Sequence, residues 1–136
     1  MLRYLLDTNI VIFALRTRPE VLRTRFTQKQ GQLAVSSITV AELVYGAEKS
    51  EQQEGNQRAV DEFLGLVDVI PFDSDAAAHS GQIRAALAAL GTPIGPYDAL
   101  IAGHARSRGL VVVTNNAREF DRVQGLLVED WTQPYA

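Results

Sequence analysis

The amino-acid sequence predicts an α/β protein in which a central parallel sheet of about five strands is covered by helices on both faces, a three-layer α/β/α sandwich. Three observations support this prediction. Short apolar runs alternate along the chain with longer segments of helical character. The apolar runs are nearly continuous, which is typical of strands buried on both faces. No repeat, low-complexity tract or linker divides the chain, so residues 1–136 are expected to form a single domain.

Capping residues and a proline mark the elements of the first half of the chain. Asp7, Thr8 and Asn9 follow the first apolar run and are typical of a helix start. Pro19 suits the first turn of a second helix, and Thr39 is expected to begin a third. The predicted elements are therefore a strand at 2–6, helices at 10–15 and 19–29, a strand at 33–36, a helix at 39–49 and, after a polar stretch at 50–56, a helix that ends near residue 66.

Prolines and glycines mark the elements of the second half. Pro71 suggests the end of a strand or a strand at the sheet edge, and Asp73 or Ser74 can cap the long helix that follows. Gly91 and Gly109 are placed to end helices. The predicted elements are a strand at 67–72, helices at 75–90 and 96–107, a strand at 110–113, a short helix at 116–122, a strand at 126–128, and a tail at 131–136 that is mobile except for Trp131.

The composition excludes several classes of function. The chain has no cysteine, which excludes disulfides, thiolate zinc sites and cysteine nucleophiles, and fits a reducing cytoplasm. No apolar run approaches the roughly 18 residues of a membrane helix, and no secretory leader is visible. The net charge of −3 argues mildly against a sequence-blind nucleic-acid binder. All basic residues except Lys29 and Lys49 are Arg, which suits phosphate contacts but equally a solvated surface.

Four acidic residues are expected at the sheet edge where the strands end and helices begin, which is where ligands bind in this class of fold. Asp7 follows the first strand. Glu42 and Glu119 are expected in the first turns of the helices that follow the second and fourth strands. Asp98 is expected in the first turn of the helix that begins at Pro96. The four acids together predict a functional site at this edge.

Each acid also has a simpler structural interpretation. Asp7 can cap a helix, and Glu42 has capping-box spacing from Thr39. Glu119 has the same spacing from Asn116, and Asp98 can respond to the helix dipole. For any single residue the structural interpretation is favoured, whereas four acids at one edge favour a site.

Carboxylates that converge need a cation or a proton. Two carboxylates about 4 Å apart repel by roughly 4 kcal/mol at an effective dielectric constant near 20, which is large beside a total stability of about 5–15 kcal/mol. An all-oxygen set selects a hard divalent ion such as Mg²⁺ or Mn²⁺, which can activate water and stabilise charge on a phosphoryl oxygen. Neutral side chains that flank the acids are expected to orient ligands around such an ion: Thr8, Asn9, Thr114, Asn115 and Asn116.

Other catalytic constellations are weaker. His79 and His104 fall inside predicted helices and are interpreted as structural residues. The sequence has no G-x-S-x-G elbow, Gly-rich phosphate loop or Walker lysine. Two alternatives stay open. One is a phosphatase or phosphotransferase with Asp7 as nucleophile, although Asn9 stands where its motif normally has a second Asp. The other is a non-catalytic module that binds RNA or a partner protein.

Five segments, in this order, resemble the motifs of one known family. They are Leu5–Asn9, Ser36–Gly46, Gly91–Asp98 with Ile101–Ala105, Thr114–Phe120, and Val128–Trp131. The chain resembles the PIN-domain ribonucleases of the VapC type, the toxins of type II (VapBC) toxin–antitoxin pairs. The resemblance covers nearly the whole chain and requires no insertion or deletion inside any of the five segments.

The resemblance implies a PIN-like fold, Mg²⁺ or Mn²⁺, and endonucleolytic cleavage of RNA, often a transfer RNA or ribosomal RNA. It also implies a cytoplasmic homodimer that is inhibited by a cognate VapB-like antitoxin. Carried over residue by residue, Asp7, Glu42 and Asp98 are metal-binding, catalytic acids. Glu119 is expected as the fourth acid. Asn116 is the alternative, because some relatives have Asp at the position of Asn116. The implied reaction is attack by a metal-activated water that leaves a 3′-hydroxyl and a 5′-phosphate.

Overall fold

A five-stranded parallel sheet forms the centre of the computed structural model, which describes residues 1–133. The strands are β1 (Tyr4–Leu6), β2 (Leu33–Ser36), β3 (Asp68–Ile70), β4 (Val111–Val113) and β5 (Val128–Glu129). They lie in the order β3-β2-β1-β4-β5, and every pairing is parallel. The predicted parallel sheet of about five strands is confirmed, and the N-terminal strand lies at its centre.

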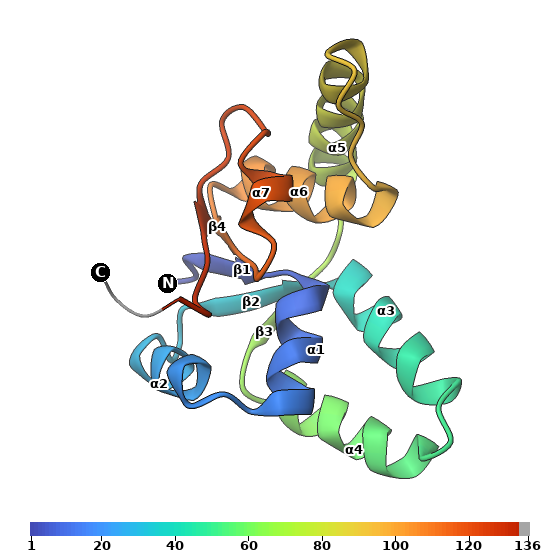
Figure 1. Cartoon of the computed structure of the whole chain (residues 1–136), viewed down its shortest axis with the longest axis vertical. Coiled ribbons are helices and arrows are strands. Elements are labelled where there is room, and N and C mark those ends of the chain that lie inside the picture. The colour runs from blue at the N-terminus through green and yellow to red at the C-terminus, as the bar shows by residue number, and fades with distance from the viewer. Residues whose placement is uncertain (134–136) are drawn as a thin grey trace.

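Helices cover both faces of the sheet, as predicted (Figure 1). One face carries α5 (Ser74–Ala89), α6 (Pro96–Arg108) and α7 (Ala117–Phe120), and the other carries α1 (Thr8–Thr17), α2 (Glu20–Gln28), α3 (Ser37–Glu48) and α4 (Gln53–Leu64). Successive residues of a strand point to opposite faces, so β1 supplies both cores. Leu5 belongs to the core beneath α5 and α6, whereas Tyr4 and Leu6 belong to the core beneath α1 to α4.

The helix that carries Glu42 begins earlier than predicted. Ser36 caps it, because the Ser36 hydroxyl oxygen accepts the N–H of Ile38 at 3.1 Å. Thr39, which was expected to begin the helix, is fully buried inside it. The prediction that Glu42 lies in the first turn is therefore wrong, since α3 begins at Ser37 and Glu42 lies in the second turn.

The two outer strands also differ from the prediction. Pro71 correctly indicated an edge strand, but β3 ends at Ile70 and its first two residues are exposed, so it is not buried on both faces. β5 begins at Val128, two residues later than expected. Trp131 is fully buried, and its ring packs edge-on against the ring of Tyr4, with 4.9 Å between the ring centroids. The rest of the predicted mobile tail, residues 134–136, lies outside the described residues.

Helices α5 and α6 approach each other closely at Gly103. A Cβ atom on Gly103 would lie 2.7 Å from the Cα of Ser80 and would also meet its backbone nitrogen and hydroxyl. Only glycine therefore allows α6 to pack against α5 at this distance. Among the helices that the structure describes, none is long and apolar enough to cross a membrane.

Candidate active site

Asp7 lies at the C-terminal end of the central strand, where it caps helix α1. Its side chain is almost fully buried, with 1% of the residue exposed. Oδ1 accepts the N–H of Ile10 at 2.7 Å, and Oδ2 accepts the hydroxyl of Thr114 at 2.6 Å. The Thr114 oxygen in turn accepts the N–H of Asn116 at 2.9 Å, which orients its proton toward Asp7. Asp7 is thus both the helix cap and a carboxylate held rigidly at the sheet edge where ligands bind.

The electrostatics of this edge connect all four predicted acids. Burial raises the pKa of Asp7 to about 6, against an ordinary value of 3.8, and it outweighs the two hydrogen bonds that lower the pKa. The charges of Asp98 and Glu42 make smaller upward contributions. Partial burial also raises the pKa of Asp98, and the charges of Glu119 and Glu42 add to the effect. Each acid therefore lies within electrostatic range of at least one other acid. Asp98 interacts with all three of the others.

Glu42 is positioned by a contact between two helices. The Thr8 hydroxyl, in the first turn of α1, donates to Oε1 of Glu42 at 2.7 Å. The same hydroxyl lies 3.0 Å from the hydroxyl of Thr39, one turn before Glu42 on α3. The predicted supporting roles of Thr8 and Thr114 thus correspond to contacts in the structure. Asn9 and Asn116 are exposed at the rim, and Asn116 forms no side-chain cap bond with α7.

Glu119 is held by a residue that the sequence did not single out. It lies in the first turn of α7, as predicted. A guanidinium nitrogen of Arg122 lies 2.8 Å from Oε1 of Glu119. Another nitrogen of Arg122 donates to the carbonyl oxygen of Thr92 at 2.6 Å. Arg122 therefore ties α7 to the loop that leads into α6 and Asp98, and the i,i+3 spacing of Glu119 and Arg122 is the signal that could have revealed the pair.

Replacing Arg122 by Met is expected to lower the free energy of unfolding by about 1 kcal/mol, because it removes a half-exposed ion pair and the bond to the Thr92 carbonyl. Urea denaturation would measure the change. Arg118→Met, on the exposed side of the same helix, is the matched control and is expected to have no effect. Equal stability of the two variants would contradict this role of Arg122.

The donor set fits a hard divalent cation, although the side chains do not surround a common point. All four donors are carboxylates, and Asp98 is half-buried without a hydrogen-bonding or ion-pair partner among residues 1–133. Each Asp7 oxygen accepts one hydrogen bond and keeps a second lone pair. Within the described part of the chain, however, no three acidic or histidine side chains stand close enough to enclose one ion. Burial, and to a smaller extent mutual repulsion, raises the pKa of Asp7 and Asp98, and a cation would relieve both effects by stabilising the charged carboxylates.

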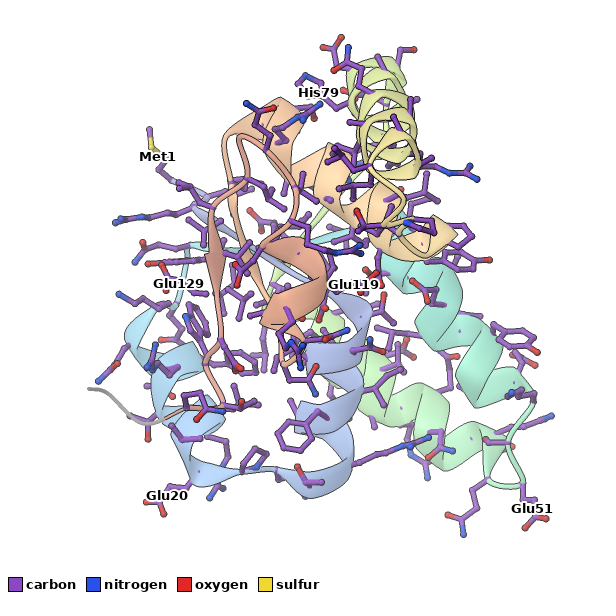
Figure 2. All side chains as sticks on the ribbon, turned by 45° about the horizontal axis from the view of Figure 1, so that its top comes forward. Met1, Glu20, Glu51, His79, Glu119 and Glu129 are labelled. Atoms are coloured by element: carbon purple, nitrogen blue, oxygen red, sulfur yellow. The ribbon has the colours of Figure 1, made fainter. Side chains whose placement is uncertain are left out.

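The two histidines and Arg106 serve contacts within the fold rather than contacts with the acids. His104 is fully buried, with Nδ1 2.8 Å from the Ser36 hydroxyl, and burial lowers its pKa. His79 lies on α5, well apart from Glu119 (Figure 2). Nε of Arg106 donates to Nδ1 of His79 at 2.9 Å, so Arg106 fastens α6 to α5. The structural interpretation of both histidines agrees with these contacts.

Comparisons with known proteins agree on one family. The model of the PIN domain matches residues 4–126. The tRNA(fMet)-specific endonuclease VapC of Shigella flexneri is 54% identical over 132 residues, which cover 97% of this chain and all of the relative. A crystal structure of DNA-bound VapBC from Salmonella typhimurium contains a chain that superposes with a TM-score of 0.94 at 54% identity, over 96% of this chain and 99% of that one. VapBC2 from Rickettsia felis, bound to a DNA fragment from its promoter, gives a TM-score of 0.91 at 36% identity, with the same coverage of both chains.

Proposed function

Because this chain belongs to the PIN domain family, and within it to the VapC ribonucleases, we propose that it is a metal-dependent endoribonuclease that acts as the toxin of a toxin–antitoxin pair. Its identity to the tRNA(fMet)-specific endonuclease of Shigella flexneri makes initiator tRNA the substrate that we propose. The reaction then takes place in the cytoplasm, where that RNA functions. The observation that carries the proposal is the rigidly held Asp7 at the central strand, coupled electrostatically to Asp98 and Glu42.

The catalytic and metal-binding residues that we propose are Asp7, Glu42, Asp98 and Glu119. A bound Mg²⁺ or Mn²⁺ ion would neutralise these carboxylates and supply the charge that activates water toward a phosphodiester. The chain's own contribution is to fix the donors in advance. Thr114 and the N–H of Ile10 hold both oxygens of Asp7, and Thr8 holds Glu42. Preorganised donors need no rearrangement when charge develops, which is the main source of electrostatic catalysis.

Glu119 is favoured over Asn116 as the fourth donor. Its carboxylate raises the pKa of Asp98, so it lies within electrostatic range of the site. Asn116 is exposed, and its backbone N–H already serves to orient Thr114. In this arrangement Arg122 holds the Glu119 carboxylate at the rim and limits its repulsion of Asp98.

The domain, the oligomer and the partner extend the same proposal. We infer a single domain over residues 1–136, supported by β5 pairing with β4 and by the buried Trp131 beyond the matched segment. We also propose a VapB-like antitoxin as partner, since two of the solved relatives are VapBC complexes, and a homodimer on the basis of the family resemblance. A groove between α1, α3 and α4, lined by Leu15, Leu43 and Val60 and reaching Glu42, is a suitable surface for an amphipathic segment of the antitoxin.

The test compares the parent chain with Asp98→Asn on initiator tRNA, after removal of any bound partner. With Mg²⁺ or Mn²⁺ we expect discrete cleavage by the parent, no cleavage in the presence of a chelator, and a loss of at least about 100-fold in the variant. End-mapping should find a 5′-phosphate and a 3′-hydroxyl. A 2′,3′-cyclic phosphate, or equal cleavage by parent and variant, would contradict the assigned chemistry.

A further inference from the structure

We propose that Tyr45 and Tyr97 form a stacking site for an unpaired RNA base immediately beside the four acids, and that Arg16 and Lys49 bind the phosphates that flank this base. This inference rests on the proposed function, because it adds a substrate-binding site to the same active-site edge. It concerns how the RNA is held and is separate from how it is cut.

Both tyrosines line one open cleft of about 500 Å³ that also contains Glu42. Tyr45 lies one helical turn after Glu42 on α3, so the two side chains share a face of that helix. Tyr97 directly precedes Asp98 at the start of α6. A base that lies against these rings is therefore connected through its own backbone to a phosphate near the acids.

The exposure of these rings requires an explanation. Tyr45 is 64% exposed and Tyr97 is 57% exposed, although each lies on a helix with a well-buried face. The other described tyrosine, Tyr4, is 3% exposed and packs in the core. Aromatic faces left open to solvent at the mouth of a cleft are the usual platform for unpaired bases, because every base has a stacking face.

The charges of the cleft suit a ribonucleotide. The Nζ of Lys49 lies over one face of the Tyr45 ring, 5.0 Å from its centroid, so a base would stack on the opposite face. Arg16 lines the same cleft from α1. These two cations are concentrated at one mouth of a protein whose net charge is −3. Together they can position phosphates while the rings hold the base, which is the combination found in single-strand binding proteins.

The size of the cleft selects a single unstacked nucleotide. A volume of about 500 Å³ lies within the range of roughly 300–1,000 Å³ for small-molecule sites. Bases within a duplex are already stacked on each other and cannot enter such a cleft without being extruded. The site therefore favours loops and single-stranded segments over helical RNA.

The experiment measures RNA binding in a chelator, so that cleavage cannot remove the probe. The probe is an unstructured uridine oligonucleotide that carries one 2-aminopurine, and a duplex of the same length serves for comparison. Parent chain, Tyr45→Ala, Tyr97→Ala and the matching Phe variants are titrated. Leu90→Ala, at the C-terminal end of α5 and outside the cleft, is the exposed control. Far-ultraviolet circular dichroism confirms that each variant is folded.

We expect each Ala variant to bind the single strand about 5- to 150-fold more weakly, and each Phe variant to bind within about twofold of the parent. The 2-aminopurine fluorescence should be quenched by the parent and the Phe variants but not by the Ala variants. The affinity of all variants for the duplex should equal that of the parent. Leu90→Ala should bind the single strand with the affinity of the parent. Lys49→Gln should weaken binding and reduce its salt dependence.

Several outcomes would overturn the stacking site. Unchanged affinity for the single strand in both Ala variants excludes it. If the Phe variants lose as much affinity as the Ala variants, the effect belongs to the tyrosine hydroxyls and not to the rings. Loss of antitoxin binding with unchanged RNA binding assigns the tyrosines to a protein partner. Initiator-tRNA cleavage, measured on the same preparations with Mg²⁺, separates the two proposals: binding with the expected pattern but without cleavage refutes the nuclease, and cleavage with unaffected binding refutes the stacking site.

Discussion

Replacing Asp7 by Asn is expected to reduce RNA cleavage by about 1,000-fold or more. Asparagine has the same shape, and its oxygen can still accept the N–H of Ile10 while its amide donates to Thr114. The variant therefore keeps the fold and the position of α1 but loses the charge at the most rigidly held point of the site. Initial cleavage rates of initiator tRNA in Mg²⁺ would measure the loss. Retention of a substantial rate would mean that Asp7 serves only as a helix cap.

The same variant is expected to be more stable than the parent without metal, and this gain separates a site residue from a purely structural cap. Burial raises the pKa of Asp7 to about 6, whereas the unfolded chain titrates near 3.8, so the folded state binds more protons between these values. The free energy of unfolding therefore falls as the pH rises through this window, by about 3 kcal/mol in total.

Asp7→Asn should remove this decrease in the free energy of unfolding with rising pH. Urea denaturation in a chelator between pH 4 and pH 8 would show it, with Asp68→Asn on the exposed edge strand as the control. Superimposable pH profiles of parent and Asp7→Asn would rule out a strained carboxylate at position 7.

Gly103→Ala is expected to destabilise the chain by about 3 kcal/mol, because the added methyl group would collide with the backbone of Ser80 and force α5 and α6 apart. Loss of this packing also disturbs the start of α6, where Asp98 lies. Gly81→Ala is the matched control, since a Cβ on Gly81 meets nothing within 4 Å. That substitution on the exposed face of α5 should stabilise the helix by up to about 1 kcal/mol. Thermal unfolding of both variants tests the pair, and two unchanged midpoints would refute the close packing.

Much of the fold could be predicted because local signals and tertiary packing agree. Gly109 ends α6 in the left-handed conformation that glycine favours, with φ of 66°, and Pro96 begins the same helix. The misplaced start of α3 has a physical cause. Ser36 and Thr39 are both good caps by composition, and the choice between them depends on the register of β2 against its neighbours, which is not a local property.

The positions of the candidate acids in the fold could largely be predicted from the sequence, whereas most of their contacts could not. Strand-to-helix junctions identified Asp7, and the structure shows the carboxylate at the expected edge. The bond between Asp7 and Thr114 depends on β1 lying beside β4, an order that periodicity cannot supply. The hydrogen bond from Arg122 to the Thr92 carbonyl joins residues 30 positions apart, and no pattern in the sequence predicted it.

The central position of the first strand has a consequence for how the protein is made. The hydrogen bond between Thr114 and Asp7 spans 107 positions of the chain. A ribosome releases the N-terminus first, at about 5–20 residues per second, so β1 and β2 leave early and can associate while β4 is still being synthesised. Until Thr114 emerges, Asp7 lacks the neighbour that orients it. The candidate site thus stays incomplete until most of the chain has been translated.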